Sequence, residues 1–158
     1  MVSTEVLKEF GFFEGLDNSE LAKIAGICHE RIRNEGDLFF VQGRKAAELH
    51  LCRSGKVDVL VRVYEPWGME VTIHKVKPGE IFGWSALVEP NIYTASAKCE
   101  GKVEALYIKG SDLLNLFEEN PHIGYMAMRN LSALVSSRLT ETREELAKEL
   151  AAVANREW

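Results

Sequence analysis

The first apolar pattern in the chain is helical. Leu21, Ile24 and Ile27 recur at three-residue intervals, directly after a polar run at 17–19 whose side chains can cap the start of a helix. A shorter helical piece is expected just before this run. We therefore predict short helices over about residues 3–27.

Between residues 28 and 109 the pattern changes to an alternation of apolar and polar residues. It is clearest in two runs: Val57, Val59, Val61 and Val63, followed by Met69, Val71 and Ile73. A period of two places each run on one face of a β-strand. The Pro and Gly of the segment 65–68 between them predict a hairpin loop. Glycines separate further short segments at intervals of about 8–12 residues, which predicts an antiparallel sandwich or barrel.

Helical spacing returns near residue 110. A first helix is expected to be capped by Ser111 or Asp112, and a second, much longer one to begin near His122, so that helices cover about residues 111–155. The order of short helices, β-rich middle and long helix is typical of the α+β class. The 158 residues suit a single domain over 1–158.

The long helix carries one apolar stripe, whose members recur at a mean spacing of about 3.6 residues. These are Met128, Leu131, Val135, Leu139, Leu146, Leu150 and Val153, with the polar Thr142 at the stripe position between Leu139 and Leu146. At a rise of about 1.5 Å per residue the stripe is longer than a small β-domain covers, and soluble monomers avoid exposed apolar strips of this length. We therefore predict a homodimer that pairs through this helix, with Arg138 and Thr142 at the seam.

Charge and composition exclude several function classes. The formal net charge is −5, and Lys and Arg are scattered among more numerous acids, so we expect no binding of DNA by this chain alone. Three well-separated cysteines suit a reducing compartment. The N-terminus lacks the features of a signal peptide, and no stretch approaches the roughly 20 apolar residues of a membrane span. We predict a soluble cytoplasmic protein without a membrane partner.

The segment 77–99 holds the most informative polar chemistry. Gly79 and Gly83 allow tight backbone bends, and the residues after Gly83 have room for one helical turn with Ser85 near its start. Exposed amides at such a turn, together with the hydroxyl of Thr94, could hold a phosphate. The alternative is a simple crossover between strands in which Trp84 belongs to the core.

The same segment resembles the phosphate-binding cassette of the cyclic-nucleotide-binding domain family, to which the catabolite activator protein and the regulatory subunits of cAMP-dependent protein kinase belong. The matching motifs are GEIFG at 79–83, ALV at 86–88 and TAS at 94–96. The resemblance extends to RNEGDLFFVQG, to LHLCRSGKVDVLV, to the opening helix and to the long last helix. It implies an antiparallel β-roll, a double-stranded β-helix or jelly roll, with short N-terminal helices and a long C-terminal helix.

Two positions depart from the family pattern. The family has a ribose-binding Glu where this chain has Trp84, and a phosphate-binding Arg where it has Tyr93, or Ile92 if the loop is shifted by one residue. The resemblance carries over Gly83 and Ser85 as backbone donors, Thr94 as a hydroxyl donor to phosphate, and Thr142 at the purine base. We therefore expect weak or absent affinity for cAMP and cGMP, because a charge-assisted contact is lost.

Metal and catalytic chemistry find little support in the sequence. Four histidines and three cysteines form no CxxC or HxxxH spacing, so we expect no metal site. No Ser-His-acid arrangement lies in a nucleophile-elbow context, so we assign no catalytic residues and expect no enzyme.

Two functional hypotheses remain. The first is a ligand-sensing regulatory domain that takes a cyclic nucleotide or another phosphorylated or anionic effector and signals through its C-terminal helix. The second is a dimeric protein-interaction module whose pocket is closed by Trp84 and Tyr93. In the activator relatives a helix-turn-helix follows the long helix, whereas this chain ends at Trp158. The chain is therefore expected to be either a stand-alone domain or the sensor fragment of a larger transcription regulator.

Overall fold

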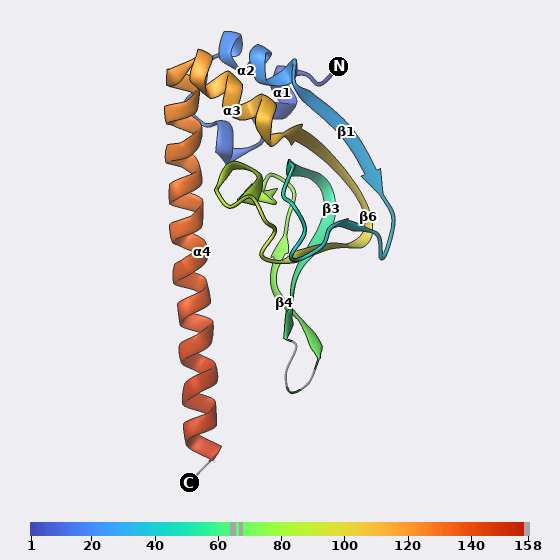
Figure 1. The fold of residues 1–158 in the computed structure, drawn as a ribbon, viewed down its shortest axis with the longest axis vertical. Helices are drawn as coiled ribbons and strands as arrows, with labels where there is room; N and C mark the ends of the chain where they lie inside the picture. Colours follow the sequence, from blue (N-terminus) through green and yellow to red (C-terminus); the bar gives the residue numbers. More distant parts are fainter. Residues whose placement is uncertain (64–65, 67, 157–158) are drawn as a thin grey trace.

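A computed structural model describes residues 1–63, 66 and 68–156 of the chain. It contains an antiparallel sheet with short helices before it and a long helix after it (Figure 1). The N-terminal elements are α1 (Thr4–Leu7), the 3-10 turn η1 (Gly11–Phe13) and α2 (Asn18–Ala25). The predicted fold class and the predicted helical region before residue 28 are confirmed.

Helix α2 begins at the predicted polar run. The Asp17 carboxylate accepts the Glu20 N–H at 2.8 Å, and the Glu20 carboxylate accepts the Asp17 N–H at 3.1 Å. This reciprocal pair is a capping box, which satisfies two amides that the helix itself cannot. Leu21 and Ile24 are buried on the core side.

Within the described part of the chain, six strands form one sheet, with every pairing antiparallel. They are β1 (Cys28–Arg33), β2 (Leu38–Phe40), β3 (Glu48–Val63), β4 (Met69–Val76), β5 (Ile81–Phe82) and β6 (Ser96–Lys109). The order is β1-β6-β3-β4, with β2 paired to β6 and β5 to β3. The two longest strands, β3 and β6, shift register near Ser54, where they bend and close the sheet into a roll (Figure 1).

The bend in β3 depends on a glycine. Gly55 has a φ of +86°, and a Cβ at this position would clash with the carbonyl oxygen of Lys102 on β6. Gly43 has a similar φ of +87° but no heavy atom within 4 Å of the corresponding position. The two glycines therefore share the backbone requirement, and only Gly55 also has a packing requirement.

We expect Gly55→Ala to lower the free energy of unfolding by about 2 kcal/mol more than Gly43→Ala does. Both variants strain the backbone, but only the first forces β3 away from β6. Urea unfolding of the two variants measures the difference. Equal losses would show that the close approach at Gly55 contributes nothing.

The predicted single apolar face of β3 is wrong beyond Val59. Val57 is buried, but a register shift between Val59 and Leu60 moves the inward side by one residue. Leu60 is then buried, and Val63 is exposed. Strand β4 follows in hairpin register, with Val63 opposite Met69, while residues 65 and 67 of the predicted loop lie outside the described residues.

Helix α3 (Gly110–Glu119) starts without the predicted cap. Neither Ser111 nor Asp112 caps it, because the chain enters the helix directly from β6, and the Gly110 N–H donates to the Ala47 carbonyl at 2.8 Å. Gly110 also approaches the Ala86 backbone so closely that a Cβ would lie 2.5 Å from the Ala86 carbonyl oxygen.

Helix α4 (Pro121–Arg156) packs on the body only along its first part. Ile123, Ala127 and Leu131 are buried in the main core, and Met128 packs against it. Met128 and Leu131, the first members of the predicted stripe, therefore pack on the body of the protein. The later members of the stripe are exposed: Val135, Leu139, Leu146, Leu150 and Val153. Figure 1 shows this part of α4 running past the roll, on the same side as the β4 hairpin.

Candidate functional site

The predicted cassette begins where β5 ends. Phe82 pairs with His50 of β3, and Gly83 then takes the left-handed conformation, with φ +77°, as the residue before the 3-10 turn η2 (Trp84–Leu87). A side chain at Gly83 would lie 3.0 Å from the Phe40 ring and 3.3 Å from the Tyr93 ring. Position 83 therefore needs glycine for both its backbone and its surroundings.

An asparagine that sequence reasoning did not single out holds the cassette loop in shape. Asn91 has a φ of +59°, a conformation that asparagine tolerates better than most residues. Its side-chain amide donates to the carbonyl oxygens of Ser85 at 3.0 Å and Ala86 at 3.2 Å. These bonds turn the chain back so that Tyr93 and Thr94 face the η2 turn.

Five of the six predicted site residues line one small cavity of about 70 Å³. Its lining residues are Phe40, Val59, Phe82, Gly83, Trp84, Ser85, Tyr93, Thr94, Ala95 and Arg138. Gly83, Trp84, Ser85, Tyr93 and Thr94 are thus brought together, and Thr142 is not among them. We call this space the inner cavity. Sequence reasoning missed its aromatic wall from β2 and β5, and it missed Arg138 as a pocket residue.

Tyr93 is the residue at which the resemblance to the family leads us to expect a cation. Its ring stacks on Phe40, with centroids 3.8 Å apart and planes 12° apart. Its hydroxyl donates to the Glu48 carbonyl at 2.6 Å and accepts the Glu48 N–H at 3.3 Å. Burial raises the pKa of Tyr93, so the phenol is neutral at physiological pH. A satisfied, stacked tyrosine keeps the inner cavity narrow.

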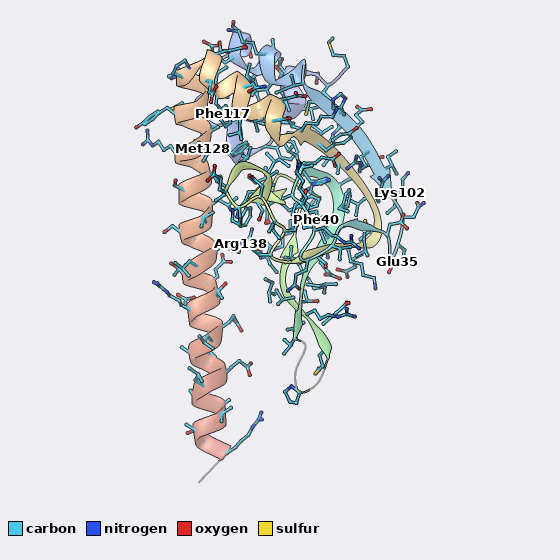
Figure 2. All side chains as sticks on the ribbon, viewed as in Figure 1. Glu35, Phe40, Lys102, Phe117, Met128 and Arg138 are labelled. Carbon is cyan, nitrogen blue, oxygen red and sulfur yellow. The ribbon has the colours of Figure 1, made fainter. Side chains whose placement is uncertain are left out.

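The cation of the inner cavity comes from helix α4 instead. Arg138 is 17% exposed at its side chain, and its guanidinium carbon lies 5.3 Å from the centroid of the Trp84 ring. Figure 2 shows Arg138 between α4 and the roll that contains Phe40. Burial lowers the pKa of Arg138, while Glu80 and Glu141 oppose that shift. The guanidinium remains charged, because an arginine loses its proton only far above neutral pH.

A signal for Arg138 does exist in the sequence. It lies seven residues, or two helical turns, after the buried Leu131, so both project from the same face of α4. A polar residue on the buried side of a helix is informative. The helical spacing alone predicts Arg138 at a dimer seam and does not relate it to the cassette.

Glu80 connects Arg138 to strand β4. One Glu80 carboxylate oxygen lies 3.6 Å from the Arg138 guanidinium and 3.0 Å from His74 Nε2. The cassette, β4 and α4 therefore meet at a single carboxylate. The ion pair with Glu80 holds α4 against the roll at Arg138.

Thr142 lies in a larger groove outside the inner cavity. This outer groove has a volume of about 900 Å³ and runs between β4 and α4. It is lined by Val71, Thr72, Ile73, Arg138, Glu141, Thr142, Glu144, Glu145, Leu146 and Glu149. Arg138 lines both spaces, so the two adjoin. Thr142 is exposed, and its hydroxyl donates to the Arg138 carbonyl at 2.8 Å.

Behind the aromatic wall lies a buried histidine. His50 is fully buried, packs against Phe82 with ring centroids 5.1 Å apart, and has Nε2 3.1 Å from Arg31 Nη1. Because arginine only donates, Nε2 accepts and the proton sits on Nδ1, which has no partner. Burial lowers the pKa of His50 to about 3, and the positive charge of Arg31 adds to the shift. Arg31 also pairs with the Glu48 carboxylate at 2.5 Å.

We expect His50 to make the free energy of unfolding depend on pH. The unfolded chain protonates this side chain below about pH 6.5, whereas the folded chain keeps it neutral down to about pH 3. Through His50, the free energy of unfolding is therefore independent of pH above about pH 6.5. Below that pH it falls by up to about 1.4 kcal/mol per pH unit, until the pH reaches about 3. His50→Phe should flatten the pH profile of urea unfolding between about pH 6.5 and 4. The surface variant His29→Gln should keep the wild-type profile, and equal profiles for wild type and His50→Phe would contradict the assignment.

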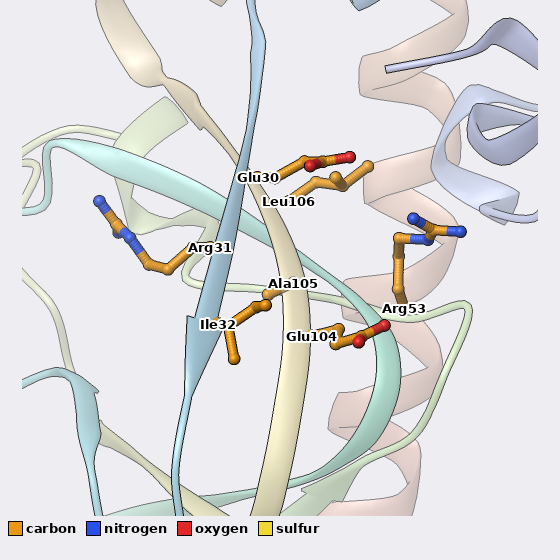
Figure 3. A pocket seen from close by; sticks show the side chains of 7 residues that line it. All are labelled: Glu30, Arg31, Ile32, Arg53, Glu104, Ala105 and Leu106. Carbon is orange, nitrogen blue, oxygen red and sulfur yellow. The ribbon is translucent and has the colours of Figure 1, made fainter. Parts of the chain in front are cut away.

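A separate hollow of about 370 Å³ lies on the outside of the roll, where β1, β3 and β6 meet. Figure 3 shows Glu30, Arg53 and Glu104 on one side of β1 and the Arg31 side chain on the other. It shares no lining residue with the inner cavity or the outer groove. Among the described residues, no group of three or more His, Cys, Asp or Glu side chains could hold a metal ion, and no helix could cross a membrane.

Fold, cassette and pocket together define a class of protein. Residues 31–120 match the family described as the cyclic nucleotide-binding domain, and the chain belongs to that family. The resemblance of the sequence to this family is therefore confirmed.

Among the relatives, the cyclic AMP receptor protein of Thermus thermophilus is 32% identical over 140 residues, which are 89% of this chain and 62% of that protein. A protein of Geobacter metallireducens with a provisional cyclic nucleotide-binding assignment is 34% identical, with a TM-score of 0.76 over 88% of this chain and 99% of that one. A cyclic nucleotide-binding domain from Methylobacillus flagellatus shares the fold, with a TM-score of 0.80 at 19% identity over 92% of this chain and 81% of that one. The chain spans about three fifths of the length of the curated relatives it matches.

Proposed function

We propose that the chain is a ligand-sensing regulatory domain that binds a small anionic effector, a cyclic nucleotide or a related compound, in the inner cavity and outer groove. The observation that carries this proposal is the position of Arg138. It is the cation of the pocket, and it belongs to the long helix that would transmit the signal. Membership of the cyclic nucleotide-binding domain family supports the same conclusion.

The mechanism follows from the partners of Arg138. Without effector, its guanidinium is held by Glu80 and lies near the Trp84 ring. An anionic group entering the inner cavity competes with Glu80 for the guanidinium. Binding thereby exchanges a contact between α4 and the roll for a contact between α4 and the effector. A ligand that distinguishes two arrangements of a helix shifts the population between them.

The natural effector binds differently from cAMP in its relatives. Trp84 and Tyr93 remove the carboxylate and the guanidinium of the family cassette, and the inner cavity of about 70 Å³ is small beside ordinary ligand pockets of roughly 300–1,000 Å³. We therefore propose weak binding of cAMP and cGMP. Thr94 lies at the inner cavity and Thr142 in the outer groove, as an effector spanning both would require.

A thermal-shift screen tests the proposal. Millimolar cAMP, cGMP and simple organic anions should raise the melting temperature of the wild type for at least one compound, because a ligand of the folded state stabilises it by mass action. Arg138→Gln should abolish that shift. Arg129→Gln removes an exposed arginine from the same helix outside both spaces, and it should keep the shift. A shift that survives Arg138→Gln would place the effector elsewhere.

One observation favours a second function, a dimeric protein-interaction module with a closed pocket. The Phe40–Tyr93 stack and the satisfied Tyr93 hydroxyl fill much of the space that an effector would need. In this alternative no compound of the screen shifts the melting temperature of the wild type.

Three further proposals, about oligomeric state, cellular location and DNA binding, are compatible with either function. We propose a homodimer through the exposed part of the α4 stripe, a cytoplasmic location and no binding of duplex DNA by this chain alone. The curated relatives are named as a receptor and as transcriptional regulators, and they are longer than this chain. We therefore also propose that this chain is the sensor part of a transcription regulator.

A further inference from the structure

The two adjoining spaces of the pocket differ sharply in charge. Of the described residues that line them, Arg138 is the one cation. Four carboxylates line the outer groove, and all come from one stretch of α4: Glu141, Glu144, Glu145 and Glu149. The inner cavity contains no carboxylate among its described lining residues. An effector therefore meets one positive charge at the inner end and an acidic wall along the rest of its path.

The opposite wall of the outer groove is apolar. Val71 and Ile73 of β4 are exposed, at 43% and 57%, and line this groove, while Leu146 adds an apolar side chain from the α4 side. These side chains offer a surface for a flat or hydrocarbon part of a ligand, whose burial is favourable at about 25 cal/mol per Å². The outer groove thus suits the body of an effector, and the inner cavity suits its anionic end.

Arg138 can bind only a limited number of anionic groups, because two carboxylates already interact with it. Its guanidinium is within 3.6 Å of Glu80, and Glu141 also acts on it electrostatically. One incoming anionic group can replace Glu80. A second anionic group on the same molecule would lie in the outer groove, where it finds carboxylates and no second cation among the described lining residues.

We propose that the acidic side of α4 is a charge filter, which restricts the effector to organic anions with a single negative group and a neutral or cationic, partly apolar body. Glu141 and Glu145, one helical turn apart in the outer groove, are its specificity-determining residues. This inference rests on the proposed function. It excludes effectors with two separated phosphates as ligands of this pocket.

Two probes that share one ring system and differ by a single sulfonate group test the filter, and the comparison with the Glu→Gln variant separates the effect of charge from that of size. Naphthalene-1-sulfonate and naphthalene-1,5-disulfonate have the same ring, and sulfonates stay ionised at all relevant pH values. Calorimetric titration of the full chain should show tighter binding of the monosulfonate. Glu141→Gln with Glu145→Gln should raise the affinity for the disulfonate by roughly 2- to 25-fold relative to the monosulfonate. The control Glu118→Gln with Glu119→Gln removes two exposed carboxylates of α3 and should leave the ratio unchanged.

Titrations at higher salt concentration and with a second variant distinguish failure of the charge filter from failure of the proposed function. Raising the salt concentration should narrow the difference between the probes in the wild type, because screening weakens the repulsion. Arg138→Gln should abolish binding of the monosulfonate. Equal affinities of wild type for the two sulfonates, with Arg138 still required, would overturn the filter and leave the proposed function intact. If neither sulfonate nor cAMP binds the wild type, both the filter and the proposed effector pocket are wrong.

Discussion

Replacing Tyr93 with arginine and Trp84 with glutamate in one chain is expected to raise its affinity for cAMP at least about thirtyfold. Losing one partner of a buried, charge-assisted pair costs about 2–5 kcal/mol, which corresponds to roughly thirty- to several-thousand-fold in affinity. Tyr93 lines the inner cavity, and its ring stacks on Phe40. An arginine at this position would remove that ring and direct a guanidinium into the cavity instead.

Calorimetric titration with cAMP measures this gain. Tyr93→Phe is the matched control, since it keeps the stacked ring and removes only the hydroxyl bonded to Glu48. We expect the control to bind cAMP as weakly as the wild type does. A double variant that is folded by circular dichroism but gains no affinity would show that the two positions do not determine nucleotide binding.

Leu146→Glu with Leu150→Glu should convert the protein from dimer to monomer. Both leucines are exposed in the single chain, at 57% and 61%, and lie one helical turn apart on the stripe of α4. A fully buried leucine stabilises by about 1.5–3 kcal/mol, and a symmetric interface contains each position twice. The loss therefore amounts to at least about a thousandfold in the dimer dissociation constant.

Sedimentation equilibrium at tens of micromolar tests this prediction. Lys148→Ala is the control, because residue 148 lies on the opposite side of α4 from Leu146 at about 100° per residue. We expect this variant to remain dimeric. A wild type that sediments as a monomer would reject the dimer itself.

Local signals in the sequence predicted much of the fold and most of the candidate site. The helix cap at Asp17 and the backbone turn at Gly83 depend on residues that are near one another in the sequence, and the structure contains both. The segment from Gly83 to Thr94 closes on itself through Asn91, so residues close in sequence reach one cavity.

The missed features depend on contacts between distant parts of the chain. The register shift after Val59 depends on how β4 pairs with β3, and the valine pattern itself continues across it. The burial of Leu131 and the placement of Arg138 depend on how α4 lies on the body, and Arg138 is 54 residues beyond Trp84 in the sequence. A helical period shows which residues share a face but does not show what that face contacts.

If Arg138 on α4 replaces the cassette cation in effector binding, its replacement by glutamine should remove that binding, which titration of the wild type and Arg138→Gln with cAMP measures. We expect weak binding to the wild type, with a dissociation constant above about 1 μM, or about −8 kcal/mol, and no measurable binding to Arg138→Gln. Submicromolar binding to the wild type, or equal binding to both chains, would contradict this role of Arg138.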